Sequence, residues 1–75
     1  MFKREKVEAD YLKQLGKRIK TIRKEKGIKQ VDLGYKCDIE KQSMSRIEAG
    51  NTNPSILLLR KIAEILDIKL SELLE

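Results

Sequence analysis

The stretch that decides the fold of this chain is QVDLGYKCDIEKQSMSRIEAG, residues 30–50. It holds two short helical patterns, at residues 30–36 and 41–49, separated by a tight turn. Apolar side chains recur in it at the spacing with which two crossed helices contact each other. These side chains belong to Leu33, Cys37, Ile39, Met44 and Ile47. We therefore predict two crossed helices joined by a small apolar seam.

The opposite face of the second pattern is polar. In helical rotation that face carries Lys41, Gln42, Ser45 and Arg46. Arginine binds guanine through two hydrogen bonds, glutamine binds adenine in the same way, and lysine suits the acceptors of guanine. A helix held by one face and carrying such groups on the other is suited to reach base edges in a DNA groove. An ordinary solvent-exposed face is the alternative interpretation.

Length and charge narrow the classes of function. The chain has 75 residues, enough for one small domain but not for a deep cleft around a catalytic centre. It carries 17 basic and 12 acidic residues, a net charge of +5. Residues 1–50 hold 14 basic and 8 acidic side chains, whereas residues 51–75 hold 3 and 4. This asymmetry suits a polyanion such as DNA, although a solvated lysine-rich surface would have the same composition.

Several kinds of chemistry are not expected. Cys37 is the only cysteine and histidine is absent, so we predict no intrachain disulfide and no metal site. Cys37 falls on an apolar helix face and is expected in the core. No nucleophile–base pair or phosphate-cradling glycine loop is evident, so we expect no enzyme, no catalytic residue and no cofactor. The N-terminus is charged and no apolar run has membrane-spanning length, which predicts a cytoplasmic protein without a membrane partner.

A first helix is predicted at residues 10–26 from apolar residues at helical spacing. Asp10 is a plausible N-cap, and Gly27 is expected to end the helix. Residues 1–9 are charged and weakly patterned. They are predicted to be either an N-terminal arm or an extension of the first helix.

Two more helices follow the central stretch. One is predicted at residues 56–66 with Ser55 as its N-cap, and a short one at residues 70–74. No alternating strand pattern is present. We therefore expect an all-α bundle of five helices, forming a single domain over residues 10–75.

Residues 15–74 resemble the helix-turn-helix DNA-binding proteins of the Cro and phage-repressor type, also called XRE-like. The matching segments are LGKRIKTIRKEKGIKQ, DLGYKCDIEKQSMSRIEAGNTNPS, LLRKIAEILDI and SELL. The resemblance implies a lambda-repressor-like DNA-binding domain that binds a palindromic operator in double-stranded DNA, usually as a homodimer, and is nucleoid-associated when bound. The favoured function is a sequence-specific transcriptional regulator, expected to be a dimeric repressor that reads the major groove with the helix at residues 41–49. A phage-type repressor, an antitoxin and a restriction–modification controller all stay open, as does activation in place of repression. We expect no effector domain after the bundle.

The resemblance also implies roles at individual positions. The polar residues of the helix at 41–49 correspond to those that read bases. Gln30, Asn51 and Thr52 correspond to phosphate contacts, although each would also suit an ordinary turn or first helical turn. Weaker candidates for phosphate contact are Lys17, Lys36 and Arg23. Arg23 and Glu48 correspond to an ion pair that ties the first helix to the reading helix.

Some positions depart from the family pattern. Asp38 and Asp67 stand where glycine is usual, so both are expected to adopt a positive φ, which aspartate tolerates better than most residues. Gly34 stands where alanine is common because the two helices approach closely there. The Ser or Thr that often caps the short helices is replaced by Lys29, Glu40 and Lys69. Each lost cap is expected to cost about 0.5–2 kcal/mol of stability.

Apolar residues outside the core stripe predict a partner surface near the C-terminus. The candidate interface residues are Leu57, Leu58, Ile65, Leu73 and Leu74. We expect a homodimer through them, although the last helix could instead cover them within one chain. The rival function is a protein-interaction module that binds a toxin or another protein through this face and binds DNA weakly. RNA binding is disfavoured because few aromatic side chains are available for stacking.

Overall fold

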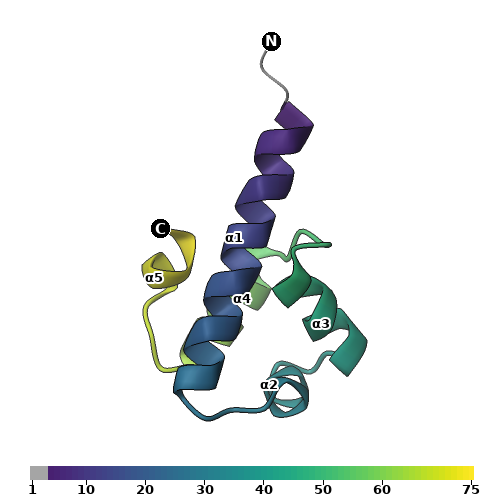
Figure 1. The fold of residues 1–75 in the computed structure, drawn as a ribbon. Helices are drawn as coiled ribbons and strands as arrows, with labels where there is room; N and C mark the ends of the chain where they lie inside the picture. The colour runs from purple at the N-terminus through teal and green to yellow at the C-terminus, as the bar shows by residue number, and fades with distance from the viewer. Residues whose placement is uncertain (1–3) are drawn as a thin grey trace.

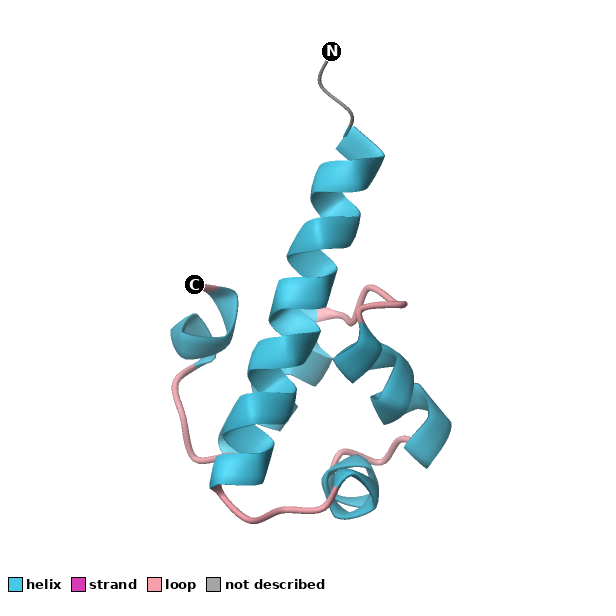
Figure 2. Ribbon diagram, viewed as in Figure 1, coloured by secondary structure: helices cyan, strands magenta, loops and turns pink. Residues whose placement is uncertain are grey.

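In the computed structural model, residues 4–75 are described, and this part of the chain forms five α-helices without a β-strand (Figure 1 and Figure 2). The helices are α1 (Arg4–Glu25), α2 (Gln30–Lys36), α3 (Lys41–Ala49), α4 (Ile56–Ile65) and α5 (Leu70–Leu74). The predicted all-α fold is confirmed. The bounds of α2, α3 and α5 are those predicted, and α4 ends one residue earlier than expected.

Helix α1 is longer than predicted. It begins at Arg4, so Asp10 lies inside the helix and is not its N-cap. Val7 and Tyr11 are four residues apart and lie on one face, and the Tyr11 hydroxyl donates a hydrogen bond to the carbonyl of Leu74, at 3.1 Å. Figure 1 shows the N-terminal turns of α1 projecting past the other helices. Residues 1–3 of the predicted arm lie outside the described part of the chain.

The core contains side chains from all five helices. Those most fully buried include Ile19, Leu33, Met44, Ile62 and Leu73. Cys37 is also buried, as its position on an apolar face predicted. Helix α3 packs against both α1 and α2, and α4 packs against α5. The reading-helix candidate is therefore supported by two neighbours rather than one.

A close approach at Gly16 brings α1 against α3. A Cβ atom placed on Gly16 would overlap the carbonyl oxygen of Ile47 and lie 2.6 Å from that of Glu48. Only glycine allows the backbones to come this near without displacing α3. The backbones of α1 and α3 are therefore in direct contact, and this contact fixes the distance between the two helices.

The turns use the backbone conformations that the sequence predicted. Asp38 has a φ of 61° and Asp67 a φ of 58°, so aspartate occupies both left-handed positions. After Asp38, the Ile39 N–H donates to the Gly34 carbonyl at 2.9 Å and closes the turn between α2 and α3. Gly50, with a φ of 78°, ends α3.

The caps also follow expectation. The side chains of Lys29 and Glu40 make no capping hydrogen bond at the starts of α2 and α3. At α4 the Ser55 hydroxyl accepts from the Leu58 N–H at 3.1 Å. At α5 the Glu72 carboxylate accepts from the Lys69 backbone N–H at 2.8 Å, which is one of the two hydrogen bonds of a capping box. The other bond needs an acceptor on the side chain of the N-cap residue, and a lysine side chain has none. The two central helices therefore depend on packing and not on caps.

Candidate nucleic-acid interface

Helix α3 turns its polar face to solvent. The side chains of Lys41, Gln42, Ser45 and Arg46 are all exposed. Met44 and Ile47, on the other face, are 0% and 4% exposed. The structure therefore brings the predicted base-reading residues onto one accessible surface, anchored by the apolar side.

Ala49, which was not among the predicted base-reading residues, belongs to the same surface. It is exposed and lies seven residues after Gln42, so the two share one helical position. A small apolar side chain there suits contact with the methyl group of thymine. The seven-residue spacing was the signal that could have identified it.

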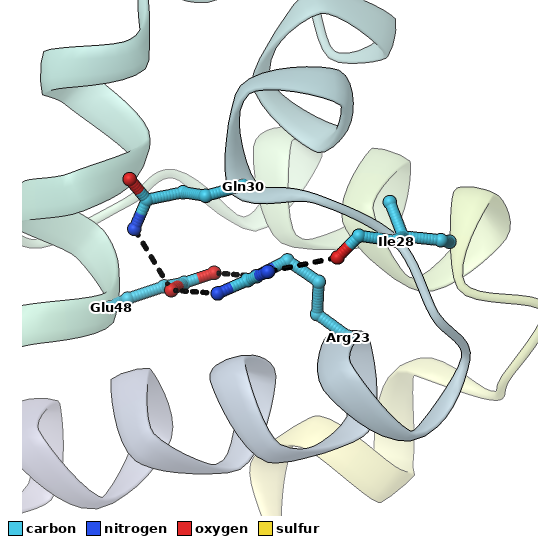
Figure 3. Close-up of polar contacts among 4 residues, drawn as sticks. All are labelled: Arg23, Ile28, Gln30 and Glu48. Carbon is cyan, nitrogen blue, oxygen red and sulfur yellow. Dashed lines mark hydrogen bonds and ion pairs between the residues drawn. The ribbon is translucent and has the colours of Figure 1, made fainter.

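A buried polar network fixes the orientation of α3 (Figure 3). The Glu48 carboxylate accepts hydrogen bonds from Nε of Arg23 at 2.7 Å and from its Nη2 at 3.1 Å. The Gln30 side-chain amide donates to the same carboxylate at 3.0 Å. Arg23 Nη1 donates to the Ile28 carbonyl at 2.8 Å. One carboxylate thus joins α1, α2 and α3, and Arg23 also holds the segment between α1 and α2.

The network changes the interpretation of Arg23. Its side chain is 8% exposed, and Nε, Nη1 and Nη2 all donate hydrogen bonds inside the protein. The predicted ion pair with Glu48 is therefore present. The phosphate contact of Arg23 stays a prediction that this geometry disfavours, because the guanidinium is enclosed and three of its five N–H groups donate within the fold.

The other phosphate-contact candidates lie at the surface. Asn51 and Lys36 are exposed, whereas Gln30 and Thr52 are half-buried. Gln30 stands at the first position of α2, where its amide also braces Glu48. Lys17 is exposed on α1 and borders a shallow hollow there with Arg18 and Thr21.

An open hollow of about 390 Å³ lies between α3 and the start of α4. Its lining includes Ser43 and Arg46 of α3, Thr52 of the following turn, and Leu58 of α4. Arg46 and Thr52 therefore border one concavity. A base-reading candidate and a phosphate-contact candidate are brought together there.

Comparison with known proteins identifies the family. The helix-turn-helix family HTH_3 matches residues 19–73, which is most of the chain. The chain belongs to this family. This membership confirms the resemblance seen in the sequence. The matched residues run from the middle of α1 to α5.

Three matches to two proteins illustrate the similarity. The HTH-type transcriptional regulator SinR of Bacillus subtilis (strain 168) is 42% identical over 62 residues, which cover 81% of this chain and 56% of SinR. A crystal structure of SinR in complex with DNA has a TM-score of 0.75 at 42% identity, covering 81% of this chain and 98% of that one. The restriction-modification controller protein C.AhdI from Aeromonas hydrophila has a TM-score of 0.80 at 31% identity, covering 83% and 94%. The chain spans about half the length of the curated SinR that it matches.

The exposed apolar surface near the C-terminus of this HTH_3 domain differs from the predicted interface. It lacks one predicted residue of α5 and includes an additional residue of α4. Leu73 is 1% exposed and belongs to the core, so its predicted place in an interface is wrong. Leu58, Ile65 and Leu74 are half-buried, and Leu57 is 71% exposed. Ile56, which was not among the predicted interface residues, is 56% exposed beside Leu57. The accessible apolar surface is therefore centred on the first turn of α4.

Three further features of the described residues concern metal ligands, helix length and the cysteine. Residues 4–75 contain no group of three His, Cys, Asp or Glu side chains placed to hold a metal ion. None of the five helices is both long and apolar enough to cross a membrane. Burial raises the pKa of the Cys37 thiol, an effect that the positive charge of Lys61 partly opposes. Cys37 therefore remains a protonated core side chain at neutral pH.

Proposed function

We propose that this chain is a sequence-specific regulator of transcription that binds double-stranded DNA and reads the major groove with α3. The observation that carries the proposal is the rigid placement of a polar helix face. Buried contacts at Gly16 and Glu48 fix α3 from behind, while its outward surface carries side chains suited to base edges. A helix fixed in this way can discriminate between sequences because its backbone needs no rearrangement to bring these side chains to the bases.

Each residue of this surface has a chemical role in the proposal. Arg46 and Lys41 supply donors for the major-groove acceptors of guanine, and Gln42 can pair with the edge of adenine. Ser45 can bond to either kind of base, and Ala49 can contact a thymine methyl group. Four of the five carry hydrogen-bonding groups, so loss of one should relax preference at a defined base pair.

Phosphate contacts would position α3 without adding sequence information. Gln30 suits this role because its amide is already oriented by Glu48. Asn51 and Thr52 follow the end of α3, and Thr52 shares a hollow with Arg46. Lys36 adds a positive charge at the end of α2. Such contacts would make binding weaken steeply as the salt concentration rises.

We also propose that the protein binds as a two-fold homodimer in the cytoplasm. Ile56 and Leu57 form an exposed apolar pair, with Leu58 beside them, and a self-complementary contact would remove this surface from water. Two copies would then present two α3 helices to half-sites about 34 Å apart on a palindromic operator. Repression would follow where the operator overlaps a promoter.

A second candidate function rests on the same apolar pair. The chain could bind a toxin or another protein through the start of α4 and bind DNA weakly. Exposure of 71% at Leu57 favours some partner at this position, and a second copy is one such partner. The DNA experiment below separates the two candidates.

The test is a selection of bound duplexes from a random pool, repeated at two salt concentrations. The proposed function predicts a palindromic consensus with two matching half-sites, and weaker recovery at the higher salt concentration. Recovery without any consensus would reject sequence-specific reading. Absence of salt-sensitive binding to any duplex would favour the protein-interaction module.

A further inference from the structure

The lysines of α1 all lie on one face of the helix. They are Lys6, Lys13, Lys17, Lys20 and Lys24, and all five are exposed. At about 3.6 residues per turn, they fall within an arc of about 60° on the side opposite the core. We refer to these five residues as the lysine stripe. The family match begins at Ile19, so three of the five lie before it.

Among the residues that the structure describes, no ion pair neutralises the charge of the stripe. Among the acidic side chains of α1 that the structure describes, only Asp10 lies beside the stripe, since Glu8 and Glu25 fall on other faces. The ion pairs within the described residues involve neither Asp10 nor the lysines of the stripe. Like charges three or four residues apart, as at Lys13, Lys17 and Lys20, destabilise a helix by about 0.2–0.5 kcal/mol a pair. A polyanion bound along the stripe would relieve this repulsion.

The stripe adjoins the proposed DNA surface at one end of α3. A Cβ atom on Gly50 would lie 2.6 Å from the Cα of Lys13 and 2.8 Å from its Cγ. Gly50 ends α3 and is followed directly by Asn51 and Thr52, two of the proposed phosphate contacts. From Lys13 the helix continues towards its N-terminus beyond the rest of the bundle (Figure 1). The positive surface therefore extends past the part of the molecule that α3 occupies.

We propose that the lysine stripe binds the phosphodiester backbone of duplex DNA outside the base pairs that α3 reads. This inference rests on the proposed function, since α3 would bring the duplex to the protein. Lysine presents a compact charge on a flexible stem, which suits phosphate contact without base readout. From Lys6 to Lys24 the stripe spans about 27 Å at 1.5 Å per residue. The bound backbone belongs either to the flank of the same duplex or to a second duplex.

The experiment compares two triple variants of the full chain. The first is Lys13→Gln, Lys17→Gln, Lys20→Gln, and the matched control is Lys26→Gln, Lys61→Gln, Lys69→Gln, which removes the same charge from exposed positions elsewhere. Glutamine keeps helix propensity close to that of lysine, and circular dichroism checks that both variants fold. The dissociation constant is measured across salt concentrations on the selected operator, both trimmed and with about one helical turn of flanking DNA on each side. A second assay mixes two labelled duplexes to detect bridging.

Binding to flanking DNA predicts that the salt slope on the long duplex falls by about 2–3 in the stripe variant, near one unit per lost contact, and less in the control. On the trimmed duplex, the stripe variant and the control variant should then have equal salt slopes. Binding to a second duplex predicts instead that bridging is lost only in the stripe variant. Equal slopes for both variants on both duplexes, without bridging by the unsubstituted chain, would overturn the inference while leaving operator recognition intact. Failure of the unsubstituted chain to prefer the operator would reject the proposed function itself.

Discussion

The carboxylate of Glu48 accepts two hydrogen bonds from the guanidinium of Arg23, at 2.7 and 3.1 Å, and the two side chains are 3% and 8% exposed. Removing one partner would leave a buried charge without compensation. We expect Glu48→Ala to lower the free energy of unfolding by about 3–5 kcal/mol, measured by urea denaturation. The double variant Arg23→Met, Glu48→Leu should lose less than the single variant, because no unpaired charge remains. A larger loss in the double variant would show that the pair contributes net stability beyond mutual compensation.

Two glycines should respond in opposite ways to alanine. At Gly16 a Cβ would overlap carbonyl oxygens of α3, so Gly16→Ala is expected to destabilise the fold by about 1–3 kcal/mol and to weaken DNA binding. At Gly34 the nearest atom to a Cβ would be the Ile39 carbonyl oxygen, at 3.3 Å, which needs only a small adjustment. Gly34→Ala should therefore be neutral or stabilising by up to about 1 kcal/mol, because alanine favours the helix. Thermal unfolding of both variants provides the comparison, and similar losses at the two positions would contradict it.

The bounds of the short helices could be predicted because turn residues and apolar spacing agreed at each of them. The left-handed conformation of Asp38, found at a φ of 61°, was expected from the family pattern, in which glycine is usual at that position. The Arg23–Glu48 pair also came only from resemblance. Nothing in the spacing of two residues on different helices could have placed them within hydrogen-bonding distance.

The errors have physical causes. Leu73 and Leu74 are adjacent in a helix of five residues, and so short a pattern does not determine which of them faces the core. The close approach at Gly16 was not predicted, because a contact between two backbones depends on the packing of α3. The early start of α1 was one of two open alternatives. Good helix-forming residues before Asp10, such as Glu5, Lys6 and Ala9, favour the extended helix.

Burial of the Cys37 thiol makes the stability of the fold depend on pH. Its pKa is raised above the ordinary value of 9.0, so the folded state holds this proton more tightly than the unfolded state does. The contribution of this thiol to the free energy of unfolding is fully present when the pH is below that ordinary value. It is lost as the pH rises through the folded-state pKa. Iodoacetamide should therefore modify Cys37 far more slowly in the native chain than in urea at the same pH. Equal rates in the two states would contradict the buried placement.

The exposed first turn of α4 should support self-association. Leu57→Glu places a charge on a side chain that is 71% exposed, so it should weaken the dimer without unfolding the protein. Tyr35→Glu is the matched control, because Tyr35 of α2 is 83% exposed and lies outside the proposed interface. Sedimentation equilibrium would compare both variants with the unsubstituted chain. An unchanged dimer in Leu57→Glu, or equal weakening in the control, would reject this surface.

The central claim is that the outward face of α3 reads bases, and the most direct test is the binding of Arg46→Ala to the selected operator and to its single-base-pair variants. Arg46 is exposed on that face and contributes no hydrogen bond from its side chain to the described fold, so its loss should leave stability almost unchanged. We predict a loss of about 1–3 kcal/mol on the operator and relaxed preference at one base pair of each half-site. An equal loss on every sequence, with the preference intact at all positions, would contradict base reading by Arg46 and reduce it to a phosphate contact.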